Sequence, residues 1–201
     1  MRGDFVCVHL DVFGDVAHRA SSPDEKERGR ASQDFLLRVL SAFTGPEPQI
    51  LRGFRGKPWL ENGPEFNMSH SGGVTAVAVS GRPVGIDIEL AARRPQVRPV
   101  AEKFFQPAEV DVLARCGWDA LLFLRMWVRK EALCKLAGEG IYLGLRSAAS
   151  GLAGASAAYR DRPAVIHEFA VNGLLVGAVA TYQPADIRWD AVPPAWEIVA
   201  S

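Results

Sequence analysis

Hydrophobic and polar residues alternate from Val84 to Leu90 at the two-residue period of a β-strand. One face of this strand carries only valine, isoleucine and leucine, whereas the other carries Gly85, Asp87 and Glu89. Because side chains two residues apart point the same way, the two carboxylates project together, and Gly85 leaves room beside them for a bulky neighbour. Such a pair suits a hard cation such as Mg²⁺. An exposed edge strand with a solvated acidic face fits the pattern equally well.

Turn residues between apolar runs predict two hairpins. Gly81-Arg82-Pro83 connects the acidic strand to Val74–Ser80, and we expect these two strands to pair. Asn172-Gly173 supplies the left-handed backbone of a tight turn between Val165–Val171 and Leu174–Tyr182. Single strands are expected at Phe5–Val12 and Trp196–Val199, and a loop rich in glycine and proline is expected at Gly53–Pro64.

Helical patterns occupy two parts of the chain. Ser22-Pro23-Asp24-Glu25 is typical of a helix start and predicts a short helix, which a second helix follows beyond Gly29. Later, Pro107 can open one helix, and a longer one is predicted over Ala120–Ala137, ended by Gly138.

A stretch rich in proline and arginine, Ala91–Val100, has the composition of a linker. Strands and helices are mixed on both sides of it, which indicates an α+β protein of two similar α/β subdomains. We place the boundary so that residues 1–95 form the N-terminal and residues 96–201 the C-terminal subdomain, with any site lying between them.

Composition narrows the classes of partner. The 201 residues include 23 basic and 23 acidic side chains, so the bulk charge favours neither nucleic acid nor an anionic membrane as partner. Three cysteines, far apart and odd in number, argue against a disulfide framework and for reduced thiols in the cytoplasm. No apolar run approaches the length of a membrane span. We expect a globular cytoplasmic protein.

Two further segments carry chemistry. Ser69-His70-Ser71, followed by two glycines, offers hydroxyl, imidazole and backbone N–H groups to a phosphate, although a polar turn between strands is the plainer interpretation. A serine hydrolase is disfavoured because the Gly-x-Ser-x-Gly elbow is missing. On the long helix, Trp127, Glu131 and Lys135 recur every four residues and share a face. Alone, the last two would be interpreted as a surface salt bridge.

Together these segments resemble the 4′-phosphopantetheinyl transferases of the surfactin-synthetase-activating type. The order and spacing match from residue 56 to residue 135. The motifs are Gly56-Lys57-Pro58, Asn67 to Ser71 with its Ser-His-Ser, Gly85-x-Asp87-x-Glu89, Phe104-Phe105 and Trp127-x-x-Lys130-Glu131-Ala132-x-x-Lys135.

The resemblance implies two halves related by pseudo-twofold symmetry, in a monomer that holds coenzyme A in the cleft between them. It implies Mg²⁺ as cofactor and an acyl or peptidyl carrier protein as partner, whose serine receives phosphopantetheine with release of 3′,5′-ADP. Neither nucleic acid nor a membrane is implied.

The resemblance also assigns residues, by their positions in the motifs. It makes Asp87, Glu89 and Glu131 the metal ligands, with Glu131 also a base toward the incoming serine. The catalytic residues that it implies are Glu131, Asp87 and Lys135. The coenzyme A contacts that follow are Lys57, Ser69, His70 and Lys135, with Lys26, Arg28 and Arg30 as contacts to the 3′-phosphate.

Two other classes use the same residues. A metal-dependent phosphohydrolase would direct the three carboxylates at a nucleotide or at coenzyme A, with water as nucleophile. An inactive carrier-binding module would keep the fold without turnover, but the complete set of acids argues against it.

Overall fold

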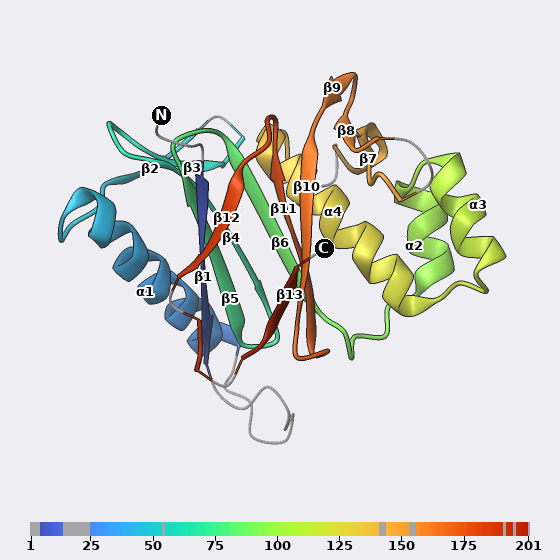
Figure 1. The fold of residues 1–201 in the computed structure, drawn as a ribbon, viewed down its shortest axis with the longest axis horizontal. Helices are drawn as coiled ribbons and strands as arrows, with labels where there is room; N and C mark the ends of the chain where they lie inside the picture. Colours follow the sequence, from blue (N-terminus) through green and yellow to red (C-terminus); the bar gives the residue numbers. More distant parts are fainter. Residues whose placement is uncertain are drawn as a thin grey trace.

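The computed structural model describes residues 5–13, 25–53, 55–140, 144–152, 156–190, 192–194 and 196–200. Two four-stranded sheets occupy the middle of the molecule (Figure 1). Helix α1 (Glu25–Thr44) flanks the first sheet, and α4 (Ala120–Ala137) flanks the second. The mixture of sheets and helices agrees with the expected α+β class, whereas the pseudo-twofold relation and the boundary at residue 95 stay predictions.

The first sheet has the strand order β12-β1-β5-β4. Strand β5 is central and antiparallel to both of its neighbours, while β12 joins β1 in parallel. The strands are β1 (Phe5–Val12), β4 (Glu65–Ser71), β5 (Val74–Ser80) and β12 (Asp186–Asp190).

The second sheet has the order β13-β10-β11-β6, and all its pairings are antiparallel. Strand β6, which carries the acidic residues, lies at one edge and pairs with β11. The strands are β6 (Val84–Leu90), β10 (Val165–Val171), β11 (Leu175–Thr181) and β13 (Ile198–Ala200).

Smaller elements complete the chain. A two-stranded ribbon precedes β4, and a small three-stranded sheet with a 3-10 turn follows α4. The ribbon is β2 (Ile50–Arg52) and β3 (Pro58–Leu60); the later pieces are Leu145–Ser147, β7 (Ala148–Ala149), β8 (Ala158–Tyr159) and β9 (Arg162–Pro163). Helices α2 (Val97–Phe104) and α3 (Pro107–Arg115) lie beside α4 (Figure 1).

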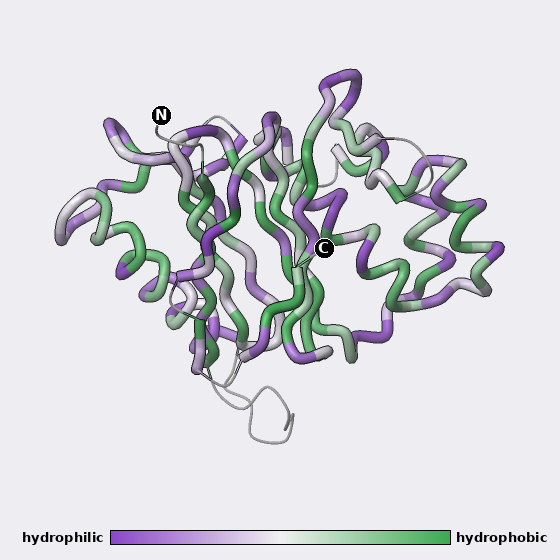
Figure 2. Tube along the Cα trace, viewed as in Figure 1, coloured by the Kyte–Doolittle hydropathy of each residue, from purple (hydrophilic) through white to green (hydrophobic). Residues whose placement is uncertain are grey.

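Three apolar cores hold these layers together. One lies between the two sheets, one between α1 and the first sheet, and one between α4 and the second sheet with α2 and α3. Figure 2 shows the hydrophobic residues concentrated on the central strands, with hydrophilic ones at outer turns. Among the described residues, no helix is long and apolar enough to cross a membrane.

Several predicted elements are confirmed. Helix α4 spans Ala120–Ala137, begins with the Asp119 side chain accepting a bond from Leu122 N, and ends at Gly138 with φ 71°. The Asn172-Gly173 turn, with φ 48° and 66°, joins β10 to β11 as expected.

Other predictions were wrong. Strands β5 and β6 do not pair, because both edges of β5 are taken by β1 and β4, and Pro83 leads the chain into the other sheet. The two helices expected on either side of Gly29 form one helix, since an apolar stripe packed on the sheet outweighs the cost of a mid-helix glycine, about 1 kcal/mol. Part of the expected loop Gly53–Pro64 is strand β3. The predicted cap at Ser22 lies outside the described residues.

Candidate active site

Strand β6 presents its acidic face to helix α4. A β-carbon at Gly85 would lie 2.0 Å from Ala132 O and 2.5 Å from Leu136 N, so only glycine lets the helix cross the strand this closely. The room beside the carboxylates, expected from the sequence, is therefore filled by α4. Asp87 and Glu89 are only 3% and 7% exposed, which excludes the solvated edge strand.

One oxygen of Asp87 is held and the other is not. Ser69 Oγ and Lys135 Nζ each donate to Asp87 Oδ1 at 2.7 Å. Asp87 Oδ2 is buried and has no hydrogen-bond partner within the described part of the chain. A buried carboxylate oxygen without a partner is costly, so it is a natural ligand for a cation.

Glu89 is held from both sides. Ser71 Oγ donates to Glu89 Oε2 at 2.7 Å, and Arg93 forms an ion pair with Oε1. Burial raises the pKa of Glu89, the hydrogen bond from Ser71 and the charge of Arg93 oppose this, and the neighbouring Asp87 carboxylate adds to it.

Glu131 faces the same cluster from α4. Burial, and after it the charge of Asp87, raise the pKa of Glu131 to about 8, and Glu89 adds to the shift. Lys135 opposes this shift through its charge, but its ion pair is with Asp87. The interpretation of Glu131 and Lys135 as a surface salt bridge was therefore wrong: the lysine reaches across to the strand.

The three carboxylates are chemically suited to bind a divalent cation, but in this structure they are not arranged around one metal position. Within the described ranges, no group of three His, Cys, Asp or Glu side chains is set up as metal ligands. Instead, Lys135 and Arg93 neutralise Asp87 and Glu89. The partnerless Asp87 Oδ2 and the raised pKa of Glu131 both indicate a negative charge that an added cation would relieve.

A cavity of about 370 Å³ opens beside Lys135. Its described lining contains no acidic side chain and four basic ones, and its apolar walls suit a planar ring. The basic residues are Arg52, Arg55, Lys57 and Lys135, and the walls include Leu36, Ile50, Pro58 and Met68.

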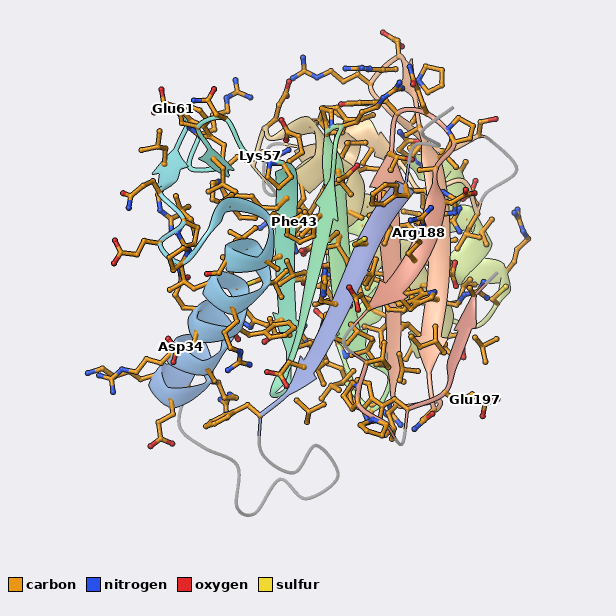
Figure 3. The ribbon with its side chains drawn as sticks, turned by 60° about the vertical axis from the view of Figure 1, so that its left-hand side comes forward. Asp34, Phe43, Lys57, Glu61, Arg188 and Glu197 are labelled. Carbon is orange, nitrogen blue, oxygen red and sulfur yellow. The ribbon has the colours of Figure 1, made fainter. Side chains whose placement is uncertain are left out.

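The cavity joins α1 and the β2–β3 ribbon to the end of α4. Lys57, labelled in Figure 3, donates from Nζ to Leu136 O at 3.2 Å, and burial lowers its pKa. Arg55 Nη1 lies 3.4 Å from Glu139 Oε2, just beyond α4. Two of the expected coenzyme A contacts, Lys57 and Lys135, therefore lie in one cavity.

The remaining expected coenzyme A contacts lie on α1 and β4. Lys26 and Arg30 are exposed on α1, and helical spacing puts them on the same face as Gln33, which lines the cavity. His70 is exposed on β4 and pairs with Thr75, whose hydroxyl lies 2.7 Å from that of Ser32 on α1. The early turns of α1 thus pass close to His70. The contacts of all three to a phosphate stay predictions, as does that of the buried Ser69.

A second cavity, of about 390 Å³, borders the acidic cluster. Glu89, Arg93 and Glu131 line it together with the apolar residues Val100, Phe104, Phe123, Leu124 and Trp127. Two of the acids thus line a largely apolar cavity, and Lys135, the ion-pair partner of Asp87, lines the basic one.

Two residues of the motifs, Phe105 and Lys130, are buried and contribute to packing. Phe105 stacks on Phe123 at 5.2 Å between ring centroids. Lys130 is fully buried, and its Nζ donates to Glu109 Oε2 at 2.6 Å and to Ala148 O. These contacts tie α4 to α3 and to β7.

Sequence analysis missed Arg52, Arg55, Arg93 and the role of Ser71. Arg52 and Arg55 lie close to Lys57 in the sequence, and three basic residues within six positions could have indicated a site for an anion. Arg93 follows Glu89 by four residues, but that spacing indicates a pair only on a helix, and here a strand end and a turn produce it.

Comparison with known proteins bears on this site. Residues 83–170 match the model of the 4′-phosphopantetheinyl transferase superfamily. The chain is 34% identical over 136 residues to the 4′-phosphopantetheinyl transferase HetI of a Nostoc species, covering 62% of this chain and 57% of the relative. It is 35% identical over 143 residues to psf-1 of Bacillus pumilus (65% and 59%), and 38% identical over 122 residues to a Bacillus subtilis transferase (57% and 54%). These alignments thus span little more than half the length of the curated relatives.

Proposed function

Because the chain is similar to 4′-phosphopantetheinyl transferases both in a family model and in individual relatives, we propose that it is such a transferase. It moves phosphopantetheine from coenzyme A to a serine of an apo acyl or peptidyl carrier protein and releases 3′,5′-ADP. The reaction makes a bond from the serine oxygen to the β-phosphorus of coenzyme A and breaks the bond from that phosphorus to the bridging oxygen.

The observation that carries this proposal is that the acids, together with their partner Lys135, border two unlike cavities. The basic cavity, with Arg52, Arg55, Lys57 and Lys135, suits a nucleotide that bears several phosphates. The apolar cavity suits the pantetheine arm or the carrier surface that approaches with its serine. A diphosphate that spans the boundary would bring its reacting phosphorus to Glu131 and Asp87.

The chain's own groups supply positioning and charge. Lys135, fixed by Asp87 at 2.7 Å, offsets negative charge as it develops on the departing 3′,5′-ADP. Glu131, ionised when it holds a cation together with Asp87 and Glu89, receives the proton of the attacking serine. Asp87 is buried and Glu131 half-buried, which limits the access of bulk water that would compete with the serine.

Asp87, Glu89 and Glu131 would hold Mg²⁺. When bound, this ion polarises phosphoryl oxygens and neutralises charge in the transition state. A monomeric state and a cytoplasmic location stay predictions.

The test is intact-mass spectrometry of several apo carrier proteins mixed with coenzyme A, Mg²⁺ and this chain. We expect the carrier to gain the mass of phosphopantetheine. Release of 3′,5′-ADP without that gain would instead indicate a phosphohydrolase and refute the proposal.

Matched variants sharpen the test. Asp87→Ala and Glu131→Ala should each abolish transfer, and the double variant should be hardly worse than either, because residues that act as a unit are not additive. Glu102→Ala removes an exposed carboxylate that pairs with Arg98 on α2, away from the cluster, and should keep full activity.

A further inference from the structure

The two sheets meet along β4 and β6 without a backbone ladder. Each strand is the edge of its own sheet, and β6 pairs through its other edge with β11. Backbone N–H groups on the free edge of β6 therefore need other acceptors.

Side chains of β4 supply these acceptors at a two-residue period. Ile86 N donates to Asn67 Oδ1 at 3.0 Å. Ile88 N donates to Ser69 Oγ, and Leu90 N to Ser71 Oγ, both at 3.3 Å. We call these three bonds the polar seam. It explains why polar residues alternate along β4 where two buried strands meet.

Two members of the seam do more than accept. Ser69 Oγ also donates to Asp87 Oδ1 at 2.7 Å, and Ser71 Oγ donates to Glu89 Oε2 at 2.7 Å. Each serine therefore links the N–H of one β6 residue to the carboxylate of the residue before it. The same two-bond unit occurs twice, one period apart.

We propose that Ser69 and Ser71 are positioning residues that hold the carboxylates of Asp87 and Glu89 in place for a divalent cation. The inference rests on the proposed function, and it gives the two serines a role other than contact with phosphate. The hydroxyl proton of each serine is directed to a carboxylate and its lone pair to a backbone N–H, so neither serine is free to turn to a bound ligand without breaking both bonds.

The consequence for Asp87 is specific. With Oδ1 occupied by Ser69 and Lys135, the rotation of the carboxylate is fixed, and Oδ2 is left buried and without a partner inside the described ranges. Partners that orient metal ligands are typically worth about 10- to 100-fold in metal affinity.

The test measures Mn²⁺ binding by electron paramagnetic resonance on the full chain with coenzyme A present. Ser69→Ala and Ser71→Ala should each raise the dissociation constant for Mn²⁺ about 10- to 100-fold. Transfer by both variants should recover at high Mg²⁺ concentration, which a purely structural defect would not do. Ser71→Thr keeps the hydroxyl at a half-buried position and should bind Mn²⁺ as wild type does.

Ser80→Ala is the matched control. Ser80 is a buried serine of β5 whose Oγ accepts a bond from Arg82 N at 3.2 Å and donates to Phe5 O at 3.4 Å. Within the described part of the chain it makes no hydrogen bond to a carboxylate. The Ser80→Ala variant should have a melting temperature lowered about as much as that of Ser69→Ala and Ser71→Ala, while its Mn²⁺ affinity stays at the wild-type value. If Ser69→Ala does not fold, Ser71→Ala and Ser71→Thr decide the question alone.

Three results would overturn the inference. A wild-type chain that binds Mn²⁺ and transfers, with Ser69→Ala and Ser71→Ala indistinguishable from Ser80→Ala in Mn²⁺ affinity, would refute the inference and leave the function intact. Weaker coenzyme A binding by Ser69→Ala without metal, at unchanged Mn²⁺ affinity, would make Ser69 a phosphate contact. A wild-type chain that neither binds Mn²⁺ nor transfers would remove the function and the inference together.

Discussion

Replacing Lys130 by methionine should destabilise the protein strongly, although Lys130 adjoins Glu131, for which a catalytic role is proposed. Its ammonium group is 0% exposed and its partner Glu109 is 2% exposed. Methionine keeps the unbranched stem but leaves the Glu109 carboxylate buried without its counter-charge. Removal of one partner from a buried ion pair costs about 3–5 kcal/mol.

The remaining bonds to Glu109 put the expected loss near the lower end of that range. Ser150 N donates to Glu109 Oε1 at 2.7 Å, and Gln106 N donates to Oε2 at 3.0 Å. Burial would raise the pKa of Glu109, but Lys130 and these N–H bonds outweigh it and lower the pKa overall. Without Lys130 the two N–H bonds still stabilise the carboxylate, so we expect a loss of about 3 kcal/mol.

The assay is urea unfolding followed by circular dichroism, with the slope of the free energy against denaturant checked for constancy. The double variant Lys130→Met, Glu109→Gln should regain part of the loss, because neutral glutamine removes the buried charge and its one amide oxygen still accepts one of the two N–H bonds. Arg98→Met, which breaks an exposed ion pair with Glu102, is the control and should have no measurable effect. A Lys130→Met protein as stable as wild type would refute the argument that this pair anchors α4.

Four further outcomes are expected. In metal-free thermal melts, wild type should lose stability as the pH rises from about 5 to 8, because the folded protein holds a proton on Glu131 (pKa about 8) that the unfolded chain has released. Glu131→Gln should weaken this trend, with the raised pKa of Glu89 left to contribute at lower pH, and an unchanged slope would contradict the assignment. Gly85→Ala should destabilise by about 3 kcal/mol or more in urea unfolding, since its β-carbon would meet Ala132 O. His70→Ala should raise KM for coenzyme A and leave kcat unchanged in steady-state assays; a collapse of kcat would move His70 to the reacting centre. Arg30→Ala should impair the reaction with coenzyme A but not with 3′-dephospho-coenzyme A, and equal losses would remove Arg30 from the site.

The sequence by itself determined the local elements and the residue types of the site. The bounds of α4 and the hairpin of β10 and β11 follow from a cap, a left-handed glycine and an apolar period, all of which act within a few residues. The same two-residue period put Asp87 and Glu89 on one face of a strand, and the resemblance to the transferase family implied that Glu131 joins them.

Only the tertiary structure decided which groups meet. The local sequence does not predict that β6 belongs to a different sheet from β5, or that Lys135 pairs with Asp87. It also does not predict that Ser69 and Ser71 accept hydrogen bonds from the backbone of β6 and donate to the carboxylates of the same strand. Strand partners and buried ion pairs depend on how the layers pack, and that packing is a property of the whole chain, because each edge and each buried charge must find a partner somewhere in it.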